Sequence, residues 1–421
     1  MNYLQIIKRL KQNETVIDGA LFSLFSFINR GLSFVLLIVL ANFISPSEYG
    51  YLNLFNTVLM VLGYFMAFST DGYMSVIYFH DKVNGINNSF TGITLITIVV
   101  STILVAFLYI TGDYFPQKLD LPIICLYMAI IICFFTVFVN LNLDLFRLQS
   151  KVKLYGVFSC SNAIINFIFT ILLVVYLHEG WMGRIYAQTI SYLLFGVISL
   201  SIFSSQGCFV KPNLKFIHKM LLWGIPLIPH LATSFVRQGC DRFIINNYYT
   251  IEDVGIFSLA LNLSNVIAIF GSGFNQSNSI TIYKTLGLEI SNNDKWKTLN
   301  RQRHMLIKLY IIITIVVIML FSILIPCLMP RYISSIPYFI ILSFYGLGIC
   351  LYLVYTNYLF YYQKTKKIMQ VTFISSLAHL VFSILLTRYS LYYTCCIYVI
   401  SQFIVVLMIR RLALKEIKKY E

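Results

Sequence analysis

Residues 89–112 read SFTGITLITIVVSTILVAFLYITG, and none of these 24 residues is Asp, Glu, Lys or Arg. A helix that crosses a bilayer needs about 20 mostly apolar residues, whereas a strand of a membrane barrel needs about 10 residues that alternate in polarity. This run is long enough for a helix and does not alternate. It therefore predicts a membrane-spanning helix.

Nine further charge-free runs follow the same pattern, and two more apolar segments are interrupted by isolated charges. The charge-free runs are 49–70, 121–143, 154–178, 185–210, 254–283, 309–330, 332–363, 368–387 and 389–409, and the interrupted segments are about 16–42 and about 218–246. The run 254–283 is longer than one crossing requires, so we expect the crossing to end within it. Together the segments predict an all-α integral membrane protein with twelve membrane-spanning helices.

The composition excludes the main soluble classes. Of the 421 residues, 59% are hydrophobic and only 11% are charged, whereas an ordinary soluble domain has about 45–50% apolar and about 25% charged residues. So little charge cannot cover the surface of a soluble enzyme of this length. The formal net charge is +15, but the basic residues are spread along the chain, so nucleic acid is not expected as a partner.

Lys and Arg are distributed unevenly between alternate loops. With twelve spans, the loops on the side of both termini hold 23 Lys and Arg residues, and the opposite loops hold 4. Those four are Lys118, Arg184, Arg331 and Arg388. Because cytoplasmic loops of membrane proteins carry the excess of Lys and Arg, the count predicts that both termini are cytoplasmic. It also supports the helix count, because one missed span would move all later loops to the opposite side and remove the difference in Lys and Arg content between the two sides.

The loops and the cysteines disfavour several kinds of chemistry. The outer loops are short, the longest cytoplasmic loop (284–303) is too short for a nucleotide-binding domain, and the sequence has no GxxxxGK[ST] motif. The nine cysteines form no CxxC pair and have no histidine at a metal-ligand spacing, which predicts free thiols. We therefore expect neither an ATP-driven pump nor an enzyme, and neither a metal nor another cofactor.

The two halves of the chain contain similar segments. NFISPSEYGYLNL at 42–54 matches NYYTIEDVGIFSL at 247–259, which lies 205 residues later, and LFRLQSKVK at 145–153 matches LFYYQKTKK at 359–367. Six helices per repeat is an even number, so the halves share one orientation in the membrane. The repeat predicts two six-helix lobes, residues 1–210 and 211–421, around a central cavity.

A family resemblance is carried by GIPLIPHLATSFVRQGCDRFIINNYYTIEDVGIFSLALNLSNVI at 224–267. This stretch resembles the seventh and eighth helices of bacterial polysaccharide flippases, the O-antigen or capsule repeat-unit (Wzx-type) members of the multidrug/oligosaccharidyl-lipid/polysaccharide (MOP) superfamily. FSFINRGLSFVLLIVLANFISPSEYGYLNLF at 25–55 is similar to the first hairpin of that family. TDGYMSVIYF at 70–79 and LFRLQSKVKLYG at 145–156 are similar to its next two cytoplasmic loops.

The resemblance implies a multi-pass protein of the bacterial inner membrane that moves an undecaprenyl-diphosphate-linked oligosaccharide to the periplasmic leaflet by alternating access. The product would serve O-antigen, lipopolysaccharide or capsule biosynthesis. The implied partners are this lipid-linked glycan, membrane lipids, a coupling cation (H⁺ or Na⁺) and other membrane proteins of polysaccharide assembly. Two alternatives remain. A cation-coupled drug exporter of the same superfamily would use acidic cavity residues, and a polysaccharide polymerase would need a larger outer loop.

Charged residues inside the predicted spans mark the candidate site, because each costs roughly 2.5–3.5 kcal/mol at the centre of a membrane helix. Arg30 lies near the middle of the first predicted helix, and Arg237 lies near the middle of the seventh. A guanidinium suits a diphosphate because it donates paired hydrogen bonds and stays protonated. The repeat places Arg30 opposite position 235, so we expect the two arginines at similar depth, one in each lobe.

Two neighbours of Arg237 extend this site. Arg242 is a third candidate contact for the diphosphate, and the alternative is that it snorkels to the outer interface. Asp241 lies four residues after Arg237, on the same face of a continuous helix. We expect Asp241 either to form a structural ion pair with Arg237 or to exchange between that arginine and a coupling proton.

Further polar residues within the spans are weaker candidates. Asp18 and His230 are candidates for an ion pair or for coupling, and His230 and His379 are expected mainly as hydrogen-bonded structural residues. The asparagines expected to line a polar cavity are Asn29, Asn162, Asn166 and Asn262. Gly224, Pro226 and Pro229 predict a seventh helix that kinks.

Overall fold

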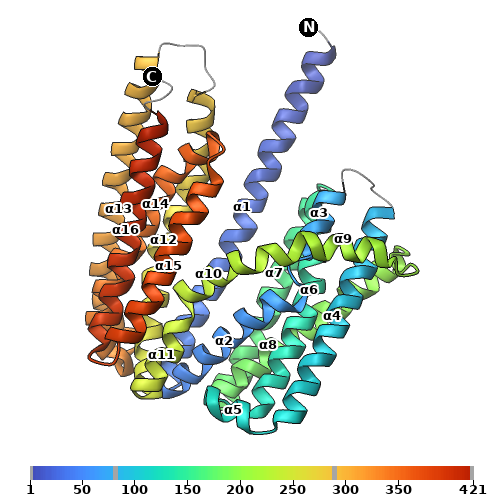
Figure 1. The fold of residues 1–421 in the computed structure, drawn as a ribbon, viewed down its shortest axis with the longest axis vertical. Helices are drawn as coiled ribbons and strands as arrows, with labels where there is room; N and C mark the ends of the chain where they lie inside the picture. Colours follow the sequence, from blue (N-terminus) through green and yellow to red (C-terminus); the bar gives the residue numbers. More distant parts are fainter. Residues whose placement is uncertain (1–2, 79–83, 287–291, 418–421) are drawn as a thin grey trace. The chain divides into compact units, whose positions relative to one another are not determined.

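The computed structural model describes residues 3–78, 84–286 and 292–417, and within these ranges the chain is built of helices without a strand (Figure 1). The helices are α1 (Tyr3–Phe43), α2 (Pro46–Met66), α3 (Asp71–Ile77), α4 (Asn84–Thr111), α5 (Tyr114–Leu119), α6 (Ile123–Leu148), α7 (Val152–Thr170), η1 (Ile171–Tyr176), α8 (Gly180–Ser205), α9 (Leu214–Gly224), η2 (Ile225–Leu227), α10 (Ile228–Gln238), α11 (Cys240–Tyr248), α12 (Ile251–Leu286), α13 (Asn292–Leu328), η3 (Pro330–Ser335), α14 (Ile336–Tyr361), α15 (Thr365–Leu386) and α16 (Leu391–Ile417).

Eleven helical segments of the described chain are long and apolar enough to cross a membrane. A twelfth crossing is present if α2 and α3, which meet at a bend of 45°, form one span together. The prediction of an all-α membrane protein with twelve spans is confirmed on that count. The chain is therefore a multi-pass membrane protein.

The chain divides into two compact units. The first comprises Met1–Ile44 and Leu54–Leu231, and the second comprises Ser45–Asn53 and Ala232–Glu421. The first turns of α2 thus belong with the second half of the chain, and α9 and η2 belong with the first. The division of the sequence into 1–210 and 211–421 stays a prediction.

Helix α9 is held in the first unit by small residues of α3 and α4. The Trp223 ring lies edge-on to the Tyr73 ring at 5.8 Å and covers Gly72, while Ile217 and Met220 cover Gly92. Because glycine has no Cβ, the large side chains of α9 can lie directly on the neighbouring helices. The segment before α9 is tied to α4 as well, since the Thr91 hydroxyl donates to the Cys208 carbonyl at 3.0 Å.

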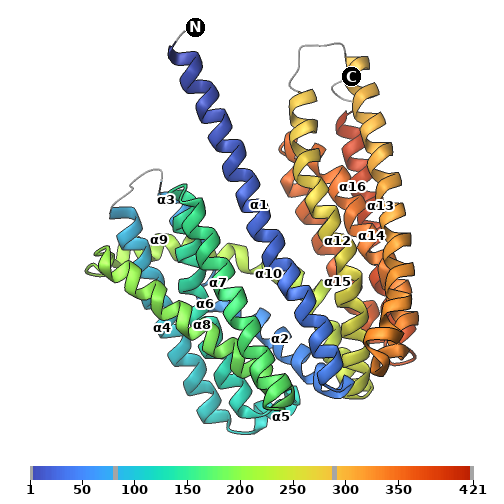
Figure 2. The same ribbon diagram turned by 180° about the vertical axis from the view of Figure 1, so that it is seen from behind.

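The core of the first unit lies between α6, α7 and α8, which run side by side in both views (Figures 1 and 2). Val139, Phe146, Phe158 and Phe195 form its central apolar cluster. Phe158 meets Phe195 edge-on with ring centroids 5.1 Å apart. Helix α1 packs against α7.

The second unit is built around α12 and α14. Of their most apolar windows, 67% and 61% of the residues are buried, against 22% for α13 at the edge of the bundle. Helix α16 packs against α14, and α15 packs against α16 (Figure 2). Because α12 and α14 are covered by protein rather than lipid, polar side chains on them can be satisfied inside the bundle.

The matched segments of the repeat fold alike and cross each other within the second unit. Ser45 and Glu48 form a reciprocal capping box at the start of α2, and Thr250 and Asp253 form the same box at the start of α12. At the crossing, a Cβ on Gly50 would overlap the Ile251 carbonyl oxygen. In the symmetric position, a Cβ on Gly255 would overlap the carbonyl oxygen of Pro46.

The structure differs from the sequence-based expectations in two elements and extends a third. The segment 218–246 is not one helix but α9, η2, α10 and α11, and the predicted kink appears as the 3₁₀ turn that contains Pro226. The run 254–283 is part of one continuous helix, α12, which extends to Leu286, and the end of the membrane crossing within it stays a prediction. The polar segment 284–303 is a loop only in part, since α13 begins at Asn292. Polar residues do not stop a helix that continues beyond the bilayer.

Candidate functional site

The predicted pairing of Arg237 with Asp241 is not formed. Helix α10 ends at Gln238, and Gly239 has φ −125° and ψ −44°, so a new helix begins at Cys240. The rule that residues four apart share a face holds only along a continuous helix. The break therefore turns the carboxylate of Asp241 away from the guanidinium of Arg237.

Asp241 instead binds two side chains of α15. Its Oδ2 lies 2.9 Å from Nε2 of His379, and its Oδ1 accepts a hydrogen bond from the Ser383 hydroxyl. Asp241 and His379 are 0% and 2% exposed. The other ring nitrogen of His379 lies 3.1 Å from the Ser401 hydroxyl of α16. The result is a buried Asp–His pair with a hydroxyl at either end.

Sequence analysis identified His379 as a histidine within a span but did not place it in the site. The two members of the pair are 138 residues apart. The indication available in the sequence was the polar spacing of α15, where His379, Ser383 and Thr387 follow one another at four-residue intervals. Such a spacing gathers polar groups on one face of a helix that otherwise consists of apolar residues.

The two arginines on this side of the second unit also have neutral partners. The guanidinium of Arg237 donates to the side-chain oxygen of Gln402, which is 1% exposed. Nε of Arg242 donates to the Ser258 hydroxyl at 3.1 Å, and Nη1 donates to the backbone carbonyl of Gln238 at 2.8 Å. Arg242 thus contacts α12 and the end of α10, and neither of these bonds engages a carboxylate.

The remaining predicted site residues are not brought together by the described contacts. Arg30 lies on α1 in the first unit with an exposed side chain. Its pairing with Arg237 across the two lobes stays a prediction. The side chains of Asp18 and His230 lie outside the described part of the chain, so their roles also stay predictions.

A polar cavity of about 270 Å³ lies within the first unit, between α1, α6, α7 and α8. Asn29, Asn162 and Asn166, three of the four predicted asparagines, line it. The fourth, Asn262, lies in the second unit, where its amide donates to the Tyr49 hydroxyl at 2.8 Å. The cavity is thus rich in amide groups, which both donate and accept hydrogen bonds.

The charged residue of this cavity is Arg184, which the sequence-based count had assigned to an outer loop. It lies in the second turn of α8, half-buried, and its Nη1 donates to the Asn166 side-chain oxygen and, at 2.8 Å, to the Thr170 hydroxyl. An arginine five residues into a helix is hard to distinguish from a loop residue by counting alone.

Local backbone geometry brings Arg184 to α7. Directly after Thr170 the helix widens into the π-helical turn η1, a feature often found at functional sites. Gly183 lies against the backbone of Leu173 in that turn, with its Cβ position 3.1 Å from the Leu173 carbonyl. A small residue is needed there because a larger side chain would push α8 away from η1.

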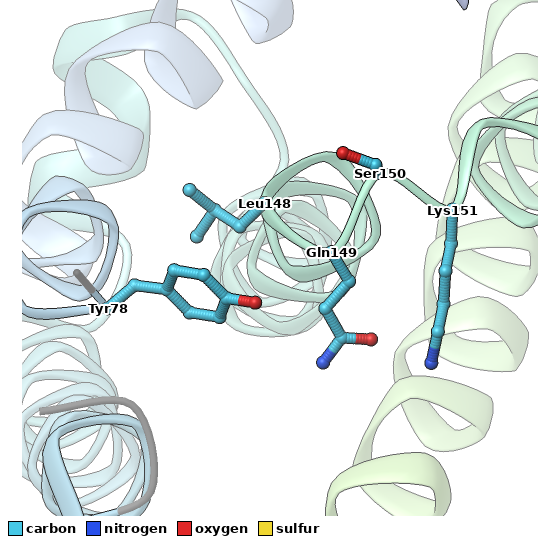
Figure 3. Close-up of a pocket in the computed structure, with 5 residues that line it drawn as sticks. All are labelled: Tyr78, Leu148, Gln149, Ser150 and Lys151. Atoms are coloured by element: carbon cyan, nitrogen blue, oxygen red, sulfur yellow. The ribbon is translucent and has the colours of Figure 1, made fainter. Parts of the chain in front are cut away.

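A second hollow, of about 530 Å³, lies at the turn between α6 and α7 (Figure 3). Tyr78, Leu148 and the segment 149–151 line it, and the Gln149 amide and Lys151 ammonium extend into the same space (Figure 3). It is larger but more open than the polar cavity. Lys151 is its single charged lining residue, and a flexible ammonium beside an open turn is a weaker basis for a specific site than a braced guanidinium.

Comparison with known proteins agrees with this architecture. Residues 17–280 match the model of a family described as polysaccharide biosynthesis protein. A Haemophilus influenzae protein named Lsg locus putative protein 1 is 24% identical over 385 residues, which cover 88% of this chain and 90% of that protein. An uncharacterized membrane protein of the same organism is 21% identical over 268 residues, or 61% of this chain and 64% of that protein.

Two solved structures show the same fold. An inward-facing multidrug resistance MATE family transporter of the MOP superfamily superposes with a TM-score of 0.73 at 11% identity, over 92% of this chain and 94% of that one. The lipid II flippase MurJ, in an inward closed conformation, gives a TM-score of 0.67 at 17% identity, over 93% and 86%. At these identities the likeness concerns the fold alone. The family match bears out the polysaccharide-biosynthesis part of the resemblance, and the two structures bear out the expected fold.

Proposed function

Because the chain belongs to the polysaccharide biosynthesis protein family, we propose that it is a flippase for an undecaprenyl-diphosphate-linked oligosaccharide. In this proposal it moves the repeat unit of an O-antigen or capsular polysaccharide from the cytoplasmic to the periplasmic leaflet of the inner membrane. Both termini lie in the cytoplasm. The glycan and diphosphate pass through a water-filled path, and the lipid tail stays in the bilayer.

The observation that carries this proposal is the way interior guanidinium groups are held. Arg184 in the first unit binds Asn166 and Thr170, and Arg237 in the second unit binds Gln402. Within the described chain, neither arginine forms an ion pair with a carboxylate. A positive charge within a membrane span is energetically costly, so its presence there usually marks a functional site. Uncompensated guanidinium groups suit an anionic cargo, and an exporter of cationic drugs would need carboxylates instead.

We further propose that the coupling ion is a proton carried by Asp241 and His379. Both members of the pair are buried. Gain or loss of one proton changes the net charge of the pair, and such a change is costly in an interior without water. A conformation that wets the pair would therefore favour proton exchange with one side of the membrane. The pair bridges α11 and α15, so its charge state would bias how these helices pack.

The flippase proposal is tested with the purified full-length chain in liposomes that contain an undecaprenyl-diphosphate-linked glycan labelled on its sugar. We expect the chain to move the glycan to the opposite leaflet, measured by its accessibility to an added glycosidase, without any change in glycan length. Lengthened glycan would indicate a polymerase. Uptake of a cationic dye without glycan movement would indicate a drug exporter and would overturn the proposal.

The coupling proposal is tested in the same liposomes by imposing either a pH gradient or a Na⁺ gradient. We expect the pH gradient to change the rate of glycan movement several-fold and the Na⁺ gradient to have no effect. Asp241→Asn should remove the response to the pH gradient, and the glycan should then move slowly at a rate that does not depend on that gradient. A response to Na⁺ instead would show that the coupling ion is not a proton, while leaving the flippase assignment intact.

A further inference from the structure

The polar cavity of the first unit holds one positive charge and no negative one. Among its lining residues are five amide side chains, those of Asn29, Asn140, Asn162, Asn166 and Gln188, and the guanidinium of Arg184, but no Asp or Glu. A charge removed from water is expensive unless it is paired. The cavity is therefore electrostatically complementary to an anion.

The hydrogen bonds of Arg184 define how an anion would bind. Both bonds that it makes to protein use Nη1, towards Asn166 and Thr170. These bonds brace the guanidinium plane and leave the edge formed by Nε and Nη2 without a protein partner among the described residues. That edge carries two parallel N–H groups, which is the geometry that binds a carboxylate through both of its oxygens.

The neutral groups of the cavity are those that recognise hydroxyl groups. Oδ1 of Asn29 is a buried acceptor that has no hydrogen-bond partner among the described residues, and an unsatisfied buried acceptor costs roughly 1–3 kcal/mol. Asn162 is held by the Ser191 hydroxyl, which donates to its Oδ1 at 2.7 Å. Tyr192 adds an aromatic ring to the lining. A sugar fits these groups, because its hydroxyl groups can donate to Asn29 and bond to the other amides, and its ring face can pack on the aromatic ring.

The volume of the cavity is sufficient for one sugar ring. About 270 Å³ corresponds to the space of about nine water molecules at roughly 30 Å³ each. A diphosphate would also be an anion, but it carries about two negative charges, whereas one cationic side chain lines this cavity. A single guanidinium with surrounding amides is matched to a single carboxylate on a hydroxylated ring.

We propose that this cavity is the binding site for one acidic sugar of the transported glycan, a uronic acid or a related sugar carboxylate, with the carboxylate on Arg184. The inference rests on the proposed flippase function and specifies its substrate class. Arg184 and Asn29 then set specificity. The diphosphate is bound elsewhere in this proposal. Neutral and acidic glycans on the same carrier should therefore differ in affinity only through their contacts with this cavity.

The test compares two carriers in liposomes with the full-length chain. One is an undecaprenyl-diphosphate disaccharide that ends in glucuronic acid, and the other is the same compound after its carboxyl group has been reduced to the alcohol. We expect the wild-type protein to bind and move the acid roughly tenfold better, the value of one charge-assisted contact. Equal handling of both compounds by the wild-type protein would overturn the inference without touching the flippase assignment. Movement of neither would instead refute the flippase assignment.

Variants then assign the preference to this cavity. Arg184→Gln should lower the affinity for the acid to that for the alcohol, and Arg184→Lys should retain part of the preference. Asn29→Asp, which is nearly isosteric, puts a carboxylate in the cavity and should also abolish the preference. Arg388→Gln is the matched control, because Arg388 is exposed and stacks on Tyr389. If Arg184→Gln impaired both compounds equally, Arg184 would contact the diphosphate or serve only the fold, and the proposal would be wrong.

Discussion

At the scale of single residues, the Asp241–His379 pair is the costliest arrangement to disturb. His379→Leu would leave the fully buried carboxylate of Asp241 with only the Ser383 hydroxyl. Breaking one side of a buried pair costs roughly 3–5 kcal/mol, so we expect a clear fall in the thermal unfolding midpoint in detergent. The double variant Asp241→Asn/His379→Leu should recover part of the loss, because no charge is then left unpaired. A double variant that loses the sum of both single losses would show that the pair is not coupled.

Arg30 and Arg237 carry the proposed contact with the diphosphate. Replacing either by Ala should reduce glycan movement at least roughly tenfold, since each removes a charge-assisted contact. Replacement by Lys should restore movement only in part, because the charge remains but the fork is lost. The measurement is the liposome assay, with Arg388→Ala as the exposed control and membrane insertion checked for each variant. Normal movement by both Ala variants would exclude this phosphate site.

The residues of the candidate site differ in how far the sequence could reveal them. Arg237, Asp241 and Arg242 stand out because charge is rare in apolar runs. Their partners do not, since Gln402 lies 165 residues from Arg237 and His379 lies 138 residues from Asp241. Pairing over such distances depends on how helices pack. Arg184 was assigned to an outer loop because it interrupts the charge-free run, which begins at residue 185, whereas α8 already begins at Gly180.

At the scale of helices, the crossing of α2 and α12 depends on two glycines. Alanine at Gly50 or Gly255 would put a methyl group on the carbonyl oxygen of Ile251 or Pro46. Overpacking of this kind costs about 1–3 kcal/mol, so we expect either variant to lower the thermal unfolding midpoint. Gly31→Ala is the control, because no atom lies within 4 Å of its Cβ position and alanine favours a helix. Unchanged midpoints for both crossing variants would mean that the helices separate at no cost.

The same crossing explains which elements were predictable. The capping boxes at Ser45 and Thr250 and the glycines five residues later are local patterns, so the repeat was visible in the sequence. The interruptions of the helices were harder to predict from the sequence. Gly239 lies among polar residues that also suit a helix, and the apolar segment that contains η1 reads like any other membrane span. Changes from α-helical to π-helical or broken geometry are decided by packing between helices, such as that of Gly183 on Leu173.

At the scale of the whole molecule, each unit has its own polar interior with its own chemistry. The first unit combines one guanidinium with amides, and the second combines arginines with a buried Asp–His pair. A division of labour follows if the cavity of the first unit selects the glycan while the second unit responds to protons. Under that arrangement, Arg184→Gln should alter which glycan is moved and leave the response to pH intact, whereas Asp241→Asn should do the opposite.

The orientation of the whole chain can be tested at the two ends of α12. This helix has 36 residues, which at 1.5 Å per residue makes it about 54 Å long and longer than the roughly 30 Å hydrocarbon core. We therefore expect its start and the chain beyond its end to lie on opposite sides of the membrane. The excess of Lys and Arg predicts that the end of α12 lies in the cytoplasm. A reporter fused after Lys295 should be active only in the cytoplasm, and one fused after Asp253 only outside it. The reverse result at either position would refute this orientation, and two reporters on the same side would show that α12 does not cross the membrane.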